Sequence, residues 1–190
     1  MATETKLRQL ADKGCPVYYF YSSERYLVRQ AVTAITRILT ADSDEDATVL
    51  DGAAPEIEQL IMAAGTISFF GTRRVVVLPE IDPAAYSDKD LEELNSTLSS
   101  LENAVVVLGS VFELERSKLK TGKRAQKLIA QCKALGYTEE LAKPKPFELK
   151  MMMIDRAKEQ KTTLPDGAAA ALLERCGEDP FLLEIGRAHV

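Results

Sequence analysis

The stretch Val17–Val28, which reads VYYFYSSERYLV, decides the fold class. Its first part, Val17–Tyr21, is an unbroken apolar and aromatic run, typical of a strand that is buried on both faces of a parallel sheet. After Ser22 and Ser23, apolar residues recur every three or four positions as far as Leu39, which places them on one face of a helix. A strand that leads directly into an amphipathic helix predicts the opening of an α/β domain.

The same alternation continues along the chain. Further short apolar runs are Thr48–Leu50, Val75–Leu78, Ala104–Leu108 and, more weakly, Leu135–Thr138. Segments with helical spacing separate them, and Ser87 is placed to cap one of these helices. We therefore expect residues 1–142 to form an α/β domain, with a parallel five-stranded sheet flanked by helices.

A change of pattern follows residue 142. Pro144 and Pro146 disfavour helix in the residues before them and indicate a linker. Beyond them, the spacing predicts one helix over Phe147–Gln160, a second from Pro165 to Gly177, and a third that begins near Asp179. Residues 143–183 are therefore expected to form a small helical domain.

Composition limits the possible chemistry. The chain has 190 residues, of which 46% are hydrophobic and 28% charged, as in ordinary globular proteins. It has no apolar stretch long enough to cross a membrane and no apparent secretory signal. Cys15, Cys132 and Cys176 lie far apart, so we expect buried apolar residues in a reducing cytoplasm rather than disulfides or a metal site. The single histidine, His189, offers little to a catalytic triad or a metal centre.

Charge is unevenly distributed, although the net charge is only −5. Asp42–Glu58 carries seven acidic residues and no basic one, whereas Glu113–Lys133 carries seven basic and two acidic residues. Such a basic run is more typical of a solvated helix face than of a nucleic-acid site, and both interpretations stay open. The candidate DNA-facing residues are Lys118, Lys120, Lys123, Arg124 and Lys127.

The turn after the first strand lacks a phosphate-binding loop. Such a loop needs glycines, a lysine and a Ser or Thr for magnesium. Tyr21–Leu27 has no glycine and no lysine, and Glu24 would repel phosphate. Pro79 and Glu80 follow the third strand, where a P-loop enzyme would hold a magnesium-binding aspartate. We therefore expect no catalytic residues, no cofactor and no metal.

Phe69 and Phe70 form the most unusual local feature, between the second helix and the third strand. Composition alone favours burial of both rings in the core. The alternative is an exposed apolar plug for a partner's pocket, in which each buried ring would contribute about 1.5–3 kcal/mol.

Taken in order, these segments resemble the delta subunit of the bacterial DNA polymerase III clamp loader. The segments that carry the resemblance are Phe20–Ala31 (FYSSERYLVRQA), Leu50–Gly52 (LDG), Phe69–Val77 (FFGTRRVVV), the basic stretch Ser117–Leu128, expected to be helical, and Leu164–Asp179. Ser22 stands where glycine is common in the family, and this departure affects the geometry of the turn.

The resemblance implies an AAA+-like fold without a working ATP site, followed by a helical lid. It implies that the chain binds the ring-shaped sliding clamp (beta) and opens it for loading onto DNA during replication. Phe69 and Phe70 would be the clamp contact, which reverses the preference for burial. The implied partners are the gamma or tau subunits, which hydrolyse ATP, and delta prime, in a hetero-pentamer.

By the same resemblance, the chain would itself be non-catalytic, a subunit of a DNA-directed DNA polymerase (nucleotidyltransferase) complex. It would work in the bacterial cytoplasm at the nucleoid, with indirect or weak DNA contact and none with membranes. The family's helical collar domain is missing from the 190 residues, and residues 184–190 are expected to be a non-native tail. Two alternatives remain: a degenerate nucleotide-binding α/β enzyme, and an α/β interaction scaffold unrelated to replication.

Overall fold

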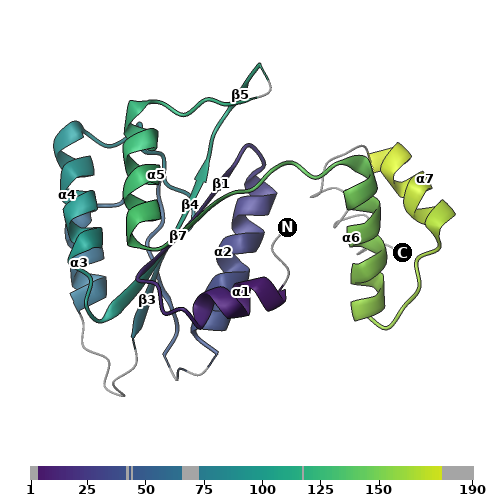
Figure 1. Cartoon of the computed structure of the whole chain (residues 1–190), viewed down its shortest axis with the longest axis horizontal. Coiled ribbons are helices and arrows are strands. Elements are labelled where there is room, and N and C mark those ends of the chain that lie inside the picture. The colour runs from purple at the N-terminus through teal and green to yellow at the C-terminus, as the bar shows by residue number, and fades with distance from the viewer. Residues whose placement is uncertain (1–3, 42, 44, 66–72, 117, 177–190) are drawn as a thin grey trace. The chain divides into compact units, whose positions relative to one another are not determined.

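The computed structural model describes residues 4–41, 43, 45–65, 73–116 and 118–176 (Figure 1). The chain divides into two compact units, residues 1–142 and residues 143–190. The first unit contains a parallel sheet covered by helices, and the second contains two described helices. No helix in the described ranges has the length and apolar character needed to span a membrane.

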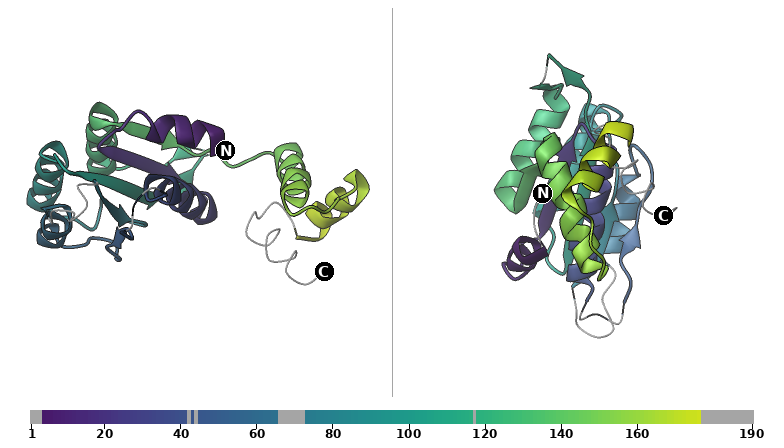
Figure 2. Two further views of the ribbon diagram at one scale, coloured as in Figure 1. Left: turned by 90° about the horizontal axis from the view of Figure 1, so that it is seen from below. Right: turned by 90° about the vertical axis from the view of Figure 1, so that its right-hand side faces the viewer.

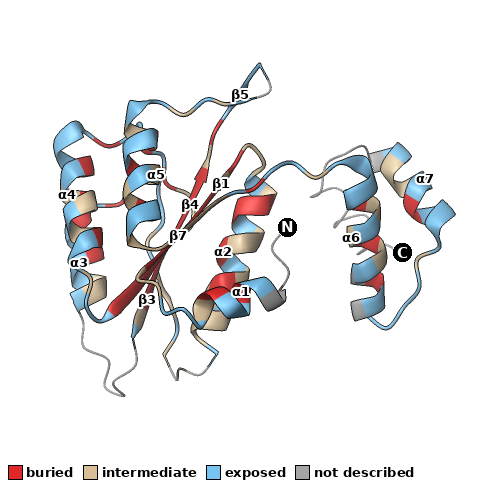
Figure 3. Ribbon diagram, in the orientation of Figure 1, coloured by how far each residue is buried: buried red, intermediate tan, exposed pale blue. Residues whose placement is uncertain are grey.

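A five-stranded sheet forms the centre of the first unit, as the sequence predicted. Its strands run in the order β2-β3-β4-β1-β7, and all neighbours are parallel. The strands are β1 (Val17–Ser22), β2 (Thr48–Val49), β3 (Arg74–Leu78), β4 (Ala104–Val111) and β7 (Tyr137–Glu140). The middle strands β4 and β1 are buried almost throughout (Figure 3), which explains their continuous apolar sequences.

Helices cover both faces of this sheet (Figures 1 and 2). They are α1 (Glu4–Ala11), α2 (Arg25–Leu39), α3 (Ile57–Gly65), α4 (Asp88–Ser99) and α5 (Lys123–Leu135). Alternate residues of β1 separate the two layers. Tyr18 and Phe20 join the core beneath α1 and α2, whereas Val17 and Tyr19 join the core beneath α3, α4 and α5.

Two features of the first unit differ from the sequence prediction. Helix α1 was not predicted, and it packs through Leu7 and Leu10. The basic stretch was expected to be helical from Ser117, which is wrong for its first residues. Strands β5 (Leu114–Glu115) and β6 (Lys118–Leu119) form an antiparallel hairpin there, and the backbone N–H of Lys120 donates to the Glu113 carbonyl (2.8 Å). Because this pairing uses the backbone groups, α5 begins only at Lys123.

The second unit contains α6 (Pro146–Glu159) and α7 (Asp166–Cys176), close to the two helices predicted there. Leu149, Met153 and Ala169 form its small buried core, and an ion pair joins Lys150 Nζ to Asp166 Oδ1 (2.7 Å). The third helix expected near Asp179 lies outside the described residues.

Candidate functional site

Ser22 closes the turn in which a phosphate-binding loop would lie. Its side chain is buried, and its Oγ donates a hydrogen bond to the Leu141 carbonyl (2.6 Å) and accepts one from the Glu24 N–H (3.1 Å). The hydroxyl therefore ties the end of β1 both to the chain after β7 and to the start of α2. With glycine at this position, both of these bonds would be lost.

An ion-pair cluster lies at the start of α2. Glu80, which follows β3, contacts Arg25 Nη2 at 2.6 Å and Arg29 Nη2 at 3.6 Å. Both arginine side chains are more than 60% exposed, so these pairs contribute little to stability. The Glu80 carboxylate therefore already contacts the two arginines that could bind an anionic ligand at the start of α2.

The loop after β3 crosses the end of β4 in close contact. The Ile81 N–H donates to the Gly109 carbonyl (2.8 Å), and Ser110 Oγ donates to the Ile81 carbonyl (2.8 Å). Ser110 Oγ also accepts a hydrogen bond from the Tyr19 hydroxyl (2.8 Å), and burial raises the pKa of Tyr19, so this phenol stays protonated and donates. A Cβ on Gly109 would overlap the Pro79 carbonyl oxygen.

These contacts hold the loop after β3 against the end of β4. In open parallel α/β sheets, nucleotides bind beyond the carboxyl ends of the strands. At that edge, Ser22 also ties the end of β1 to the chain after β7. Among the described residues, no group of three His, Cys, Asp or Glu side chains is arranged to hold a metal ion.

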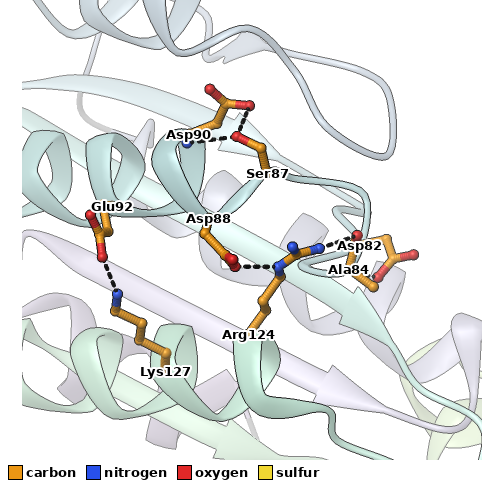
Figure 4. Close-up of polar contacts among 8 residues, drawn as sticks. All are labelled: Asp82, Ala84, Ser87, Asp88, Asp90, Glu92, Arg124 and Lys127. Atoms are coloured by element: carbon orange, nitrogen blue, oxygen red, sulfur yellow. Dashed lines mark hydrogen bonds and ion pairs between the residues drawn. The ribbon is translucent and has the colours of Figure 1, made fainter.

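Two of the five predicted basic residues contact α4 (Figure 4). Arg124 Nε donates to Asp88 Oδ1 (2.7 Å), and Arg124 Nη1 donates to the Ala84 carbonyl (3.2 Å). Lys127 Nζ pairs with Glu92 Oε1 (2.9 Å). The hydrogen bond between Arg124 and Asp88 lowers the pKa of Asp88 and raises the pKa of Arg124. The charges of Arg124 and Lys127 are therefore largely balanced within the protein.

The other three basic residues are exposed and lie before or at the start of α5. Lys118 is on the β5–β6 hairpin opposite Glu115, Lys120 follows the hairpin, and Lys123 begins the helix. The structure therefore divides the predicted basic set into a part that faces α4 and a part near the hairpin.

Sequence reasoning did not find the groove beside the hairpin. It has a volume of about 570 Å³ and lies between the hairpin, α5 and the ends of β1 and β7. We call it the α5 groove, and it is lined by Tyr21, Lys118, Leu119, Thr121, Gln126, Ile129, Ala130, Lys133 and Glu140. Of these residues, only Lys118 was a predicted site residue, because the others come together through strand order rather than sequence spacing.

The predicted clamp contact, Phe69 and Phe70, lies outside the described residues. The elements on either side are well anchored. Helix α3 is held by buried Ile57 and Leu60, and β3 is paired with β4 along its whole length. Near its C-terminal end, α3 also exposes two large apolar side chains, Ile61 (46% exposed) and Met62 (70% exposed).

Solved structures share this fold. The DNA clamp loader delta protein of Bacillus subtilis aligns with a TM-score of 0.63 and 23% identity over 97% of this chain and 56% of that one. A DNA polymerase III gamma subunit-related protein from Thermotoga maritima gives a TM-score of 0.54 and 16% identity over 82% and 52%. Domain III of Thermotoga maritima DnaA, a replication initiation protein, gives a TM-score of 0.58 and 13% identity over 95% of this chain and 78% of that one. No curated protein sequence matches significantly.

These similarities define the class of fold as AAA+-like, with a five-stranded parallel sheet flanked by helices, as the sequence predicted. The chain spans about half the length of the first two of these structures. The sequence model of the family described as "DNA polymerase III, delta subunit" matches residues 18–135, well over half of the chain. The chain therefore belongs to the DNA polymerase III delta subunit family, as its sequence motifs indicated.

Proposed function

We propose that this chain binds the ring-shaped sliding clamp and opens it for loading onto DNA during replication. The observation that carries the proposal is the family match over residues 18–135, because it includes the segment with Phe69 and Phe70. These two rings are the proposed clamp contact. The anchored elements on either side, α3 and β3, would give the contact a firm base from which to transmit force.

Opening follows from preferential binding. A bound protein shifts the equilibrium between closed and open rings only by the difference in its affinity for the two states. Two phenyl rings buried in a clamp pocket would contribute about 3–6 kcal/mol in total. If the clamp pocket accepts both phenyl groups only when the neighbouring subunit interface of the clamp is strained, part of this binding free energy favours the open clamp.

The turn after β1 supports a role without ATP hydrolysis by this chain. Tyr21–Leu27 has no glycine or lysine to bind phosphate, and Glu80 pairs with Arg25 and Arg29 at the start of α2. We propose that the gamma or tau subunits hydrolyse ATP, with delta prime completing a hetero-pentamer. The chain is then a non-catalytic member of the polymerase complex, working in the bacterial cytoplasm at the nucleoid.

Weak or indirect DNA contact is also part of the proposal. Lys118, Lys120 and Lys123 are its main candidates, since all three are exposed. Arg124 and Lys127 would contribute less, because their charges already face Asp88 and Glu92. Substituting a lysine that contacts phosphate should weaken DNA binding equally for all DNA sequences and should reduce its dependence on salt.

Clamp affinity tests the proposal. We expect the double variant Phe69→Ala/Phe70→Ala to lose about 3–5 kcal/mol of binding free energy, or roughly 150- to 5000-fold in Kd, with an unchanged fold. The matched control is Phe147→Ala/Met151→Ala, which removes two exposed apolar side chains of α6. Equal binding by the two double variants would reject the assigned contact. A parent chain that does not bind the clamp would support the unrelated scaffold instead.

A further inference from the structure

The α5 groove is lined by both cationic and apolar side chains. Lys118 comes from the hairpin, and Lys133 comes from α5. Both side chains are exposed, and neither forms an ion pair within the part of the chain that the structure describes. Lys120 and Lys123 continue the positive charge into the neighbouring pocket. An anionic chain that crosses the groove would therefore meet two to four unpaired ammonium groups.

The lining also includes an aromatic ring that packs against two others. Tyr21 packs against Tyr19 (5.5 Å between ring centroids) and edge-on against Phe112 (5.9 Å). Leu119, Ile129 and Ala130 complete the apolar lining. Apolar side chains beside an aromatic ring suit a planar ligand group.

Hydrogen-bond acceptors also face the groove. Gln126 Nε2 already donates to the Thr121 carbonyl (3.0 Å), which leaves the amide oxygen of Gln126 to accept. Glu140 adds a carboxylate to the lining. Exocyclic amino groups of nucleobases are donors that match such acceptors. These acceptors match a donor group of the ligand, whereas Lys118 and Lys133 match its anionic backbone.

We propose that the α5 groove binds an unstacked base of single-stranded DNA, with the flanking phosphates contacting Lys118 and Lys133. Bases in a duplex are stacked and paired, so only a single strand can supply one to a groove of this kind. The choice of DNA rests on the proposed role in replication, whereas the planar base and the anionic chain follow from the groove itself.

The test measures fluorescence anisotropy of labelled dC12 with the full 190-residue chain. Lys118→Glu/Lys133→Glu should weaken binding at least tenfold and lower the slope of log K against log salt by about 1.4, the value for two phosphate contacts on a single strand. Ala130→Trp should fill the groove and weaken binding about tenfold with the slope unchanged. The charge-matched control Lys13→Glu/Lys89→Glu, at exposed positions outside the groove, should change affinity less than twofold.

Three results would overturn the proposal. The first is equal affinity for dC12 and a 12-base-pair duplex, and the second is equal behaviour of the groove and control variants. The third is displacement of dC12 by an acidic, leucine-containing hexapeptide at lower concentration than by unlabelled dC12, which would identify a protein partner. Clamp capture by the same preparations separates the two proposals. Lys118→Glu/Lys133→Glu should retain clamp binding, and a parent chain that binds dC12 but no clamp would refute only the proposed function.

Discussion

Replacing Gly109 with alanine tests whether the loop after β3 crosses β4 as closely as the structure indicates. An added Cβ would overlap the Pro79 carbonyl oxygen and lie 2.8 Å from Val28 Cγ1. Pro79 is backbone in a crossing loop, so relief requires the loop to move away from β4. That movement would also break the hydrogen bond from the Ile81 N–H to the Gly109 carbonyl.

The expected cost follows from these two effects. Overpacking in a well-packed region costs about 1–3 kcal/mol, and loss of a backbone hydrogen bond costs about 0.5–1.5 kcal/mol. We therefore expect Gly109→Ala to lower the free energy of unfolding of the first unit by about 2–4 kcal/mol. With a urea m-value of about 2 kcal/mol/M, the midpoint should fall by about 1–2 M.

Tyrosine fluorescence is a suitable assay because all six tyrosines lie in residues 1–142 and the chain has no tryptophan. Gly122→Ala is the matched control, since a Cβ there has nothing within 4 Å, and its midpoint should shift by less than about 0.5 M. If Gly109→Ala unfolds at the same urea concentration as Gly122→Ala, the close crossing of β4 is wrong.

Three further predictions concern the same unit. Tyr19→Phe should cost about 1 kcal/mol in the same titration, because it removes the hydrogen bond to Ser110 and keeps the ring; no change would mean that the bond does not form. Burial raises the pKa of Cys132 to about 12, so at pH 8 iodoacetamide should label the partly exposed Cys15 in the native protein but Cys132 only in urea, as peptide mass mapping can check. Millimolar Mg-ATP should leave the unfolding midpoint unchanged; a rise would reveal binding and favour a degenerate nucleotide enzyme.

The sheet was predictable from the sequence because its central strands are buried on both faces. Continuous, β-branched and aromatic runs such as Val17–Tyr21 and Ala104–Leu108 are typical of strands in the middle of a parallel sheet. Strand order was not predictable from these runs alone, since it depends on which helices cover which face. The short helix α1 was missed because it gives the core few apolar residues, with Leu7 and Leu10 buried among those described.

The candidate site was less predictable. Lys118 and Lys120 were assigned to a helix because they share a basic run with Lys123, and the two-residue strands of the hairpin leave almost no periodic signal. The partners of Arg124 and Lys127 lie 36 and 35 residues earlier, so no local pattern shows that these charges are already balanced. Cys15 was expected to be buried and is partly exposed, and the side chain of Cys176 lies outside the described residues.

Ring opening is the most direct test of the proposed function. A sliding clamp that carries a donor and an acceptor dye on opposite sides of one subunit interface reports the separation of that interface by energy transfer. We predict that the parent chain, added without ATP, lowers the transfer efficiency, and that Phe69→Ala/Phe70→Ala leaves it at the value of the free clamp. Opening by these two residues would be contradicted if the transfer efficiency stayed at the free-clamp value with the parent chain bound. It would also be contradicted if the parent chain and the double variant lowered the efficiency equally.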